Sequence, residues 1–306
     1  MAAGLLAGKV IVVTGAGGGV GRGIALEAAR EGASVVVNDL GGSVTGSGAD
    51  LTPAAKVVGE IKALGGNAVA SGHSVSDFAD GAKIVGAAIE AFGRIDGVVN
   101  NAGILRDAIF HKISEKDFDD VVRVHLKGSF NVARAAAEHF KAQGSGAFVH
   151  MTSTSGLIGN FGQVNYCAAK MGVVGLSKSI ALDMARFNVR SNCIAPFAFT
   201  RMVGSIPQET PEQQARMKVI ERLKAEKIAP FVVALMSDAA KDVSGQIFGV
   251  RNNEIYLFSQ PRPFRTAHTD EPGWTPSKIV ERVLPMFRPD FYKLDRSMDV
   301  FTWDPV

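Results

Sequence analysis

Cysteine is scarce in this sequence, and the two cysteines form no metal-binding or disulfide pattern. Cys167 and Cys193 are the only ones among 306 residues, and neither belongs to a Cys-x-x-Cys or Cys/His spacing that would bind zinc. We therefore expect no metal site and a protein of a reducing compartment, which we take to be the cytoplasm.

Long apolar runs and blocks of like charge are also missing. No segment offers the roughly 18 uninterrupted apolar residues that a membrane span needs, and the start MAAGLLAGKV lacks the charged region of a secretory signal. The 33 basic and 30 acidic residues are spread along the chain and give a net charge of +3, whereas a nucleic-acid-binding surface needs a basic patch. We expect no membrane span and no nucleic-acid partner, and a small-molecule substrate instead.

Glycine is abundant, at 34 residues, and short apolar runs alternate with longer segments of helical period. This alternation is typical of βα units around a parallel sheet. The strands are expected at residues 10–13, 34–38, 67–71, 97–99, 147–151, 189–194 and 246–250. The helices are expected at residues 20–30, from 53 to the Gly65-Gly66 pair, and at 78–92, 118–143 and 165–187. The pattern predicts an α/β fold with a doubly wound parallel sheet of about seven strands over residues 1–250.

Two regions interrupt this alternation. Residues 197–227 are rich in proline and charge, contain one expected helix at 212–224, and lie where such folds carry a substrate lid. Residues 251–306 form a C-terminal extension with one expected helix at 276–286. Because its aromatic side chains are costly to expose to water, we expect the extension to pack on the active site or at a subunit interface rather than to hang on the surface.

A glycine-rich segment follows the first expected strand and reads Thr14-Gly15-Ala16-Gly17-Gly18-Gly19-Val20-Gly21. Backbone amides at a helix N-terminus favour an anionic pyrophosphate, and glycine lets the phosphates approach without a Cβ in the way. The alternative is an ordinary tight turn, which the flanking strand and helix disfavour. The expected dinucleotide contacts here are Gly15, Gly17, Gly19, Val20 and Gly21.

Asp39 ends the second expected strand, about twenty residues after the glycine loop, and Leu40 follows it. A carboxylate at this place accepts hydrogen bonds from the adenosine ribose and repels the 2′-phosphate of NADP. Both residues are therefore expected to contact the cofactor, which we predict to be NAD. The alternative is that Asp39 caps the neighbouring glycine-rich loop.

Tyr166 and Lys170 lie four residues apart, so on a helix both side chains project from one face. A phenol has a pKa near 10, and a nearby ammonium together with a nicotinamide cation would lower that pKa toward the working range. Tyr166 would then exchange a proton with the substrate oxygen while hydride passes to or from nicotinamide. Ser153, at the end of the fifth expected strand, is expected to hold that oxygen.

Four motifs together make the chain resemble the short-chain dehydrogenase/reductase family. They are Thr14-Gly-x-x-x-Gly-x-Gly, Asn100-Asn101-Ala102-Gly103, Ser153 thirteen positions before the tyrosine, and Tyr166-x-x-x-Lys170. The resemblance covers about residues 9–250 and implies a Rossmann-type single domain that is usually a homodimer or homotetramer. It also implies further cofactor contacts by Ser74, Val75, Asn101, Ala102, Gly103, Tyr166, Lys170, Pro196 and Thr200.

One branch of the family is especially similar. The segments Val37-Asn38-Asp39-Leu40-Gly41-Gly42 and Gly159-Asn160-Phe161-Gly162-Gln163 resemble the (3R)-hydroxyacyl-CoA dehydrogenase domain of peroxisomal multifunctional enzyme type 2, which is also described as a 17β-hydroxysteroid dehydrogenase. His125 stands where most family members have an asparagine that holds a relay water. Two readings stay open for it: catalytic participation in the relay, or a histidine that fills a helix interior. Ser74-Val75 replaces the usual Asp-Val beside adenine.

The leading function is therefore NAD-dependent oxidation of a secondary alcohol to a ketone, with a 3-hydroxyacyl-CoA of fatty acyl or steroid side-chain type as the expected substrate. A free hydroxysteroid or another bulky alcohol is the alternative within this class. A non-catalytic dinucleotide-binding protein is the alternative of another class, but such proteins normally lose the Tyr or the Lys. A nucleotide-sugar epimerase would need a different glycine spacing and a larger C-terminal domain than about 55 residues can build.

Overall fold

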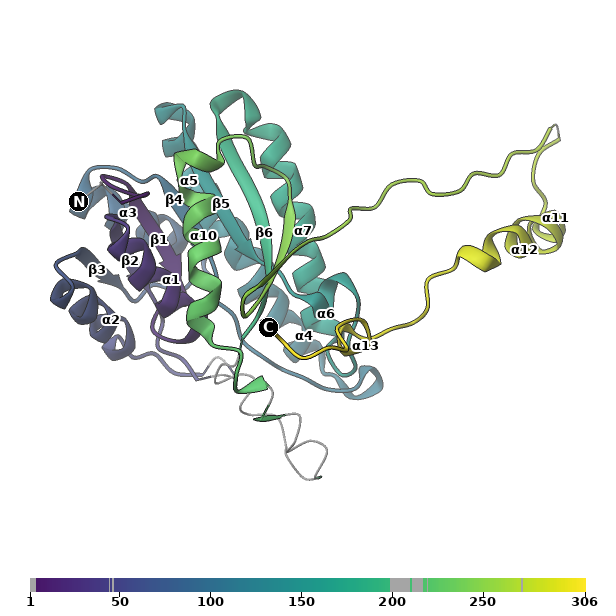
Figure 1. Ribbon diagram of the computed structural model, residues 1–306, viewed down its shortest axis with the longest axis horizontal. Helices are drawn as coiled ribbons and strands as arrows, with labels where there is room; N and C mark the ends of the chain where they lie inside the picture. Colours follow the sequence, from purple (N-terminus) through teal and green to yellow (C-terminus); the bar gives the residue numbers. More distant parts are fainter. Residues whose placement is uncertain are drawn as a thin grey trace.

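The computed structural model describes residues 4–43, 45, 47–198, 210, 217–218, 220–270 and 272–306. These residues form one eight-stranded sheet in the order β3-β2-β1-β4-β5-β6-β7-β8, with helices on both faces (Figure 1). The strands are β1 Val10–Thr14, β2 Ser34–Asn38, β3 Asn67–Ser71, β4 Gly97–Asn100, β5 Gly146–Met151, β6 Val189–Phe197, β7 Ile247–Arg251 and β8 Glu254–Leu257. The doubly wound α/β fold predicted from the sequence is confirmed.

All strand pairs are parallel except β7 with β8, which is antiparallel. The parallel strands are covered on both faces, which explains their nearly continuous apolar sequences: all five residues of β1 are buried. The eighth strand was not among the seven expected ones. It lies within the segment assigned to the C-terminal extension, and it alternates between half-buried and exposed residues, as an edge strand does.

The helices divide between the two faces of the sheet. One core lies under α1 (Gly19–Arg30), α2 (Thr52–Ala63) and α10 (Ala229–Met236). The other lies under α3 (Phe78–Phe92) and α5 (Gly128–Gln143), with α7 (Val164–Asp183) at its side. The chain reverses its direction of winding between β1 and β4. In such folds, ligands bind at the carboxyl ends of the strands beside this reversal.

The connection between β4 and β5 is helical for most of its length. It comprises a 3-10 turn at Phe110–Lys112, α4 (Glu115–Val122), a π-helical segment at Arg123–Lys127 and then α5. A short helix, α6 (Thr154–Leu157), follows β5. The continuous helical period expected over residues 118–143 thus contains one π-bulge, a feature that often marks functional sites.

After β8 the chain leaves the body and forms an arm, which we define as residues 259–294 (Figure 1). The arm carries α11 (Pro276–Lys278), a π-helical turn (Ile279–Val283) and α12 (Leu284–Phe287), in place of the single helix expected at 276–286. The chain then returns to the body through α13 (Ser297–Val300), which lies beside α6. Many apolar side chains of the arm are exposed: Phe264, Trp274, Ile279, Val280, Leu284, Met286, Phe291, Tyr292 and Leu294.

Within the described part of the chain, no helix combines the length and the apolar character required to cross a bilayer.

Candidate active site

Tyr166 and Lys170 both lie on α7, as their spacing predicts, and Ser153 faces them from the end of β5. Ser153 caps α6, because its side chain accepts a hydrogen bond from Ser155 N at 3.1 Å. The Lys170 Nζ lies 5.6 Å from the centre of the Tyr166 ring and donates a hydrogen bond to the Met151 carbonyl at 2.6 Å. The three expected catalytic side chains therefore gather at the carboxyl end of β5.

Burial is the main cause of the pKa shifts of Tyr166 and Lys170. It raises the pKa of Tyr166 to about 12, although a hydrogen bond with Ser153 opposes the shift. Burial also lowers the pKa of Lys170 to about 7. In the protein alone the shift of the phenol pKa thus runs opposite to the one that the sequence predicts for the complex with nicotinamide, because desolvation outweighs the hydrogen bond with Ser153.

His125 lies in the π-helical segment, with its ring edge-on to Tyr166 at a centroid distance of 5.2 Å. Its Nε2 is 2.8 Å from the Ile104 carbonyl oxygen and 3.0 Å from the Ile104 nitrogen, and its buried Nδ1 has no partner among the described residues. Burial lowers the pKa of His125 to about 3, so the ring is neutral. Gly103 allows this close packing, since a Cβ there would lie 2.3 Å from the imidazole Cε1.

The glycine loop connects β1 to α1 with little space to spare. Gly15 has φ +64°, where side chains are disfavoured, and a Cβ on Gly21 would lie 2.2 Å from the Gly15 carbonyl oxygen. Gly19 opens α1 and Val20 is buried behind it. Gly18 at the N-cap offers no side chain, and the first turn of α1 holds no acidic residue. The amides at this 12-residue helix start thus have no side-chain cap, which fits an anionic pyrophosphate.

Asp39 follows β2 and turns toward the glycine loop. Its Oδ2 accepts a hydrogen bond from Gly17 N at 2.8 Å, and its Oδ1 accepts one from Gly41 N at 2.7 Å. The loop-capping alternative is therefore realised in the structure. Each carboxylate oxygen has a second lone pair, so this contact is compatible with a ribose hydroxyl as well. Leu40 beside it is exposed.

Thr14 begins the glycine-rich segment but was not among the expected site residues. Its Oγ1 accepts hydrogen bonds from the backbone amides of Asn101 and Ala102, at 3.0 and 3.1 Å. The Asn101 side chain donates in return to the carbonyls of Thr14 and Gly15, at 3.0 and 3.1 Å. This reciprocal clasp fixes the loop after β4 against the glycine loop. Its place at the start of the Thr14-Gly-x-x-x-Gly-x-Gly motif was its signal in the sequence.

The remaining expected cofactor contacts lie on neighbouring elements. Ser74 and Val75 follow β3, where the Val75 carbonyl accepts a hydrogen bond from Asn131 Nδ2 at 2.8 Å. Pro196 is near the end of β6, in register with Val250 of β7. Thr200 lies outside the described residues, as do residues 199–209, 211–216 and 219 of the expected lid and its helix.

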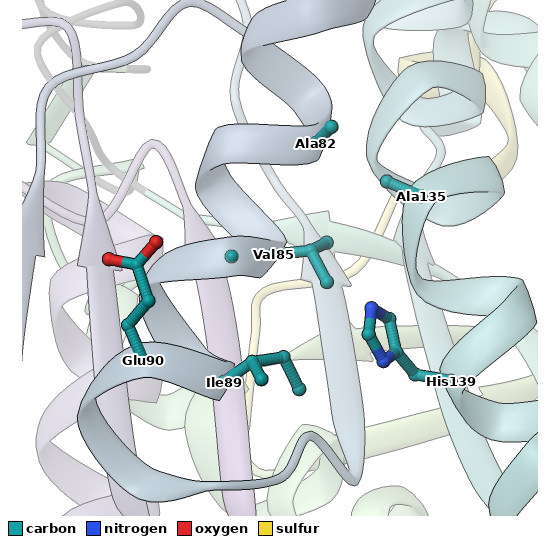
Figure 2. Close-up of a pocket in the computed structure, with 7 residues that line it drawn as sticks. Ala82, Val85, Ile89, Glu90, Ala135 and His139 are labelled. Atoms are coloured by element: carbon teal, nitrogen blue, oxygen red, sulfur yellow. The ribbon is translucent and has the colours of Figure 1, made fainter.

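Two further observations concern a hollow elsewhere in the fold and the possibility of a metal site. The structure forms a hollow of about 260 Å³ between α3 and α5 (Figure 2), lined by Ala82, Val85, Gly86, Ile89, Glu90, Ala135 and His139. None of the residues that line it is an expected site residue. Among the residues that the structure describes, no group of His, Cys, Asp or Glu side chains could hold a metal ion.

The family model described as short chain dehydrogenase matches residues 9–211. The chain belongs to the short-chain dehydrogenase family. It is an oxidoreductase acting on CH-OH groups, and the family binds NAD or NADP.

Several relatives share most of this chain. A short-chain type dehydrogenase/reductase of Mycobacterium tuberculosis is 51% identical over 76% of this chain and 79% of its own length. The peroxisomal multifunctional enzyme type 2 of Mus musculus is 48% identical over 78% of this chain, which spans only 31% of that longer protein. A hydroxyacyl-CoA dehydrogenase of Mycobacterium tuberculosis is 37% identical, covering 90% of this chain and 87% of its own. The resemblance to the multifunctional enzyme branch is confirmed.

Solved structures agree with the fold. A short chain dehydrogenase from Mycobacterium avium superposes with a TM-score of 0.79 at 38% identity, covering 93% of this chain and 96% of that one. A 7α-hydroxysteroid dehydrogenase in complex with NADH and 7-oxo glycochenodeoxycholic acid gives 0.74 at 31% identity, covering 83% and 97%.

Proposed function

We propose that this short-chain dehydrogenase oxidises the 3-hydroxyl of a 3-hydroxyacyl-CoA to a ketone with NAD. The observation that carries the reaction is the group of Ser153, Tyr166 and Lys170 at the carboxyl end of β5, beside a glycine loop that leads into an uncapped helix. The hydroxyacyl-CoA dehydrogenase relative supports the substrate class. The steroid-bound neighbour supports a hydroxysteroid or other bulky alcohol as the second candidate.

Each candidate catalytic residue has its own role in the proposed reaction. Bound nicotinamide supplies the hydride acceptor. Ser153 would hold the substrate oxygen, and Tyr166, as its phenolate, would take the proton from that oxygen as the C–H bond breaks. Lys170 orients the ribose side of the cofactor, and His125 lies behind the phenol as a neutral group that can pass on a proton through water or hold the ring in place.

We propose that the cofactor is NAD rather than NADP because of Asp39. An ionised carboxylate facing the glycine loop would repel a 2′-phosphate. Replacing Asp39→Ala should raise the KM for NAD and admit NADP. An unchanged cofactor preference would remove this part of the proposal.

We also propose where the arm and the end of the C-terminal extension pack. Ser297 of α13 contacts Thr154, the neighbour of Ser153, through their hydroxyls, and its backbone amide donates to the Gly159 carbonyl at 2.9 Å. This supports the packing of the extension's end on the active site. The exposed apolar arm supports packing at a subunit interface of a homodimer or homotetramer. Size-exclusion chromatography with light scattering tests the oligomer, and cell fractionation tests the expected cytoplasmic location.

The reaction is tested by following NADH formation with a panel of 3-hydroxyacyl-CoA esters, hydroxysteroids and simple alcohols. Wild type is compared with Tyr166→Phe, which keeps the ring and removes the proton-transferring hydroxyl. We expect the rate of the variant to fall by about 10²–10⁴-fold. Equal turnover by both proteins would contradict catalysis through the phenol. NADH binding without turnover of any substrate would favour the non-catalytic alternative.

A further inference from the structure

Asn165 directly precedes Tyr166 at the start of α7, and it is fully buried. Its Nδ2 donates one hydrogen bond to the Arg106 carbonyl at 2.9 Å and another to the Asp117 carbonyl at 3.2 Å. Its Oδ1 accepts a hydrogen bond from the backbone amide of Tyr166 at 2.8 Å. Only this orientation of the side-chain amide satisfies all three bonds, because two carbonyl oxygens face its nitrogen and an N–H faces its oxygen.

The bonds of Asn165 join three segments of the chain. Arg106 belongs to the loop after β4 and Asp117 to α4, and their carbonyls accept from a side chain 59 and 48 residues further along the sequence. Charge holds the first two segments together, since Arg106 Nε lies 3.5 Å from Asp117 Oδ1 and its Nη2 lies 3.8 Å from Asp120 Oδ2. The Arg106 guanidinium is thus directed to α4, while its carbonyl is directed to Asn165.

The loop after β4 also contacts the chain that enters α7. Ala108 N donates a backbone hydrogen bond to the Gly162 carbonyl at 2.9 Å, and Ala108 pairs with Gln163 as an isolated β-bridge. These contacts lie before the first residue of α7, whereas Asn165 lies within its first turn and binds the amide of Tyr166 itself. Asn165 therefore carries the connection from the loop into the helix, up to the residue that bears the phenol.

The same loop holds the histidine ring that lies against the phenol. His125 Nε2 is 2.8 Å from the Ile104 carbonyl oxygen, and its ring meets that of Tyr166 edge-on at a centroid distance of 5.2 Å. Ile104 and Arg106 are only two residues apart, so one short piece of the loop binds His125 directly and Tyr166 through Asn165. The position of the phenol relative to His125 therefore depends on the Asn165 hydrogen bonds.

We propose that Asn165 is a positioning residue that fixes the start of α7 to the loop after β4 and thereby places the phenol of Tyr166 for proton transfer. This inference rests on the proposed role of Tyr166. Asn165 acts through the backbone of Tyr166 and not on the substrate. A misplacement of about 1 Å at a reacting group can lower a rate by about 10²-fold, so loss of the Asn165 hydrogen bonds should affect turnover rather than cofactor affinity.

The first test compares kcat at saturating substrate and the Kd for NADH in wild type, Asn165→Ala and Asn192→Ala. Asn192 on β6 is the matched control: it is equally buried, its Nδ2 donates to the Val243 carbonyl at 2.8 Å, and its Oδ1 accepts from Gln246 N at 3.0 Å. Both variants should lose a similar amount of thermal stability, but only Asn165→Ala should lower kcat, by about 10²-fold, with the Kd for NADH unchanged. An unchanged kcat, an equal loss in both variants, or an equal loss of NADH affinity would overturn the inference.

A double-mutant cycle separates positioning from a general structural role. In Tyr166→Phe the phenol is already absent, so adding Asn165→Ala should not lower the residual rate further. Losses that multiply would show that Asn165 acts independently of the phenol and would overturn the inference. Asn165→Leu serves as a second variant if the alanine variant folds poorly, because it fills the space without making hydrogen bonds; wild-type turnover by Asn165→Leu would also contradict the proposal.

Failure of this inference is distinguishable from failure of the proposed function. If Tyr166→Phe is inactive while Asn165→Ala keeps the wild-type kcat, only the role of Asn165 is wrong. If Tyr166→Phe keeps the wild-type rate, the phenol is not the proton acceptor and both proposals fall.

Discussion

The body of the protein and its arm follow opposite rules of burial. In the body, Phe148 of β5 is 1% exposed and packs against Phe140 at a centroid distance of 4.9 Å. In the arm, Tyr292 is 97% exposed and Leu294 fully so. The body thus gains its stability within one chain, whereas side chains of the arm such as Tyr292 and Leu294 gain almost nothing from this chain and would be buried by another surface. The proposed catalytic residues Ser153, Tyr166 and Lys170 all lie in the body.

The largest expected difference between the two regions is in the effect of removing an aromatic ring. Phe148→Ala leaves a cavity in the core under α3 and α5 and should lower the free energy of unfolding by about 3–5 kcal/mol. Tyr292→Ala removes a ring that touches mostly water and should change it by less than about 0.5 kcal/mol. Urea titration of dilute protein measures both. A large loss in Tyr292→Ala at low concentration would show that the arm folds onto its own body.

The sequence predicted the body far better than the arm, for a physical reason. Strands such as β2 and β3, and helix α3, were predicted at their observed bounds, because strands buried on both faces read as short apolar runs and helices as a 3.6-residue period. The edge strand β8 was missed because only one of its sides meets the body. In the arm, the expected helix contains a π-helical turn at Ile279–Val283.

In the candidate site too, the sequence predicted relations between residues that are close in sequence better than relations between distant ones. Tyr166 and Lys170 were predictable because their relation is local, four residues on one helix. Thr14 was not assigned, because its partner Asn101 lies 87 residues away in sequence. The direction of the Tyr166 shift was also not predictable from spacing, since burial decides it and burial depends on the whole fold.

The next largest effect is expected for Lys170, whose burial in the body should make the free energy of unfolding depend on pH. Its pKa falls from 10.5 to about 7 on folding, so between these pH values the unfolded chain binds more protons than the folded one. The free energy of unfolding should therefore rise with pH across this window. In Lys170→Met this rise disappears, a difference on the order of 3 kcal/mol.

Thermal or urea unfolding at a series of pH values from about 6 to 10 measures the effect. Lys62→Met, on the exposed side of α2, is the matched control and should keep the wild-type slope. A parallel stability curve for Lys170→Met would show that Lys170 reaches water in solution.

A smaller effect is expected at the glycine loop, where the body has no spare volume. Gly21→Ala places a Cβ 2.2 Å from the Gly15 carbonyl oxygen, so the loop must move; we expect about 1–3 kcal/mol of destabilisation and weaker dinucleotide binding. Gly59→Ala on α2 meets nothing within 4 Å and should stabilise the helix by about 0.5–1 kcal/mol. Unfolding curves together with NADH fluorescence titration separate the two variants. Unchanged NADH affinity in Gly21→Ala would place the cofactor elsewhere.

The smallest expected effect is in the arm. Arg265 forms an ion pair with Asp290 at 2.7 Å, and the Asp290 carboxylate raises the pKa of the guanidinium. More than half of the Arg265 side chain is exposed, so water and salt screen the pair. Arg265→Ala should leave the melting temperature of the dilute protein unchanged. If the arm is buried against a second copy of this chain, the same variant should instead weaken self-association, which sedimentation equilibrium detects. A lowered melting temperature without any change in association would mean that the ion pair stabilises the body, and the two regions would no longer be independent.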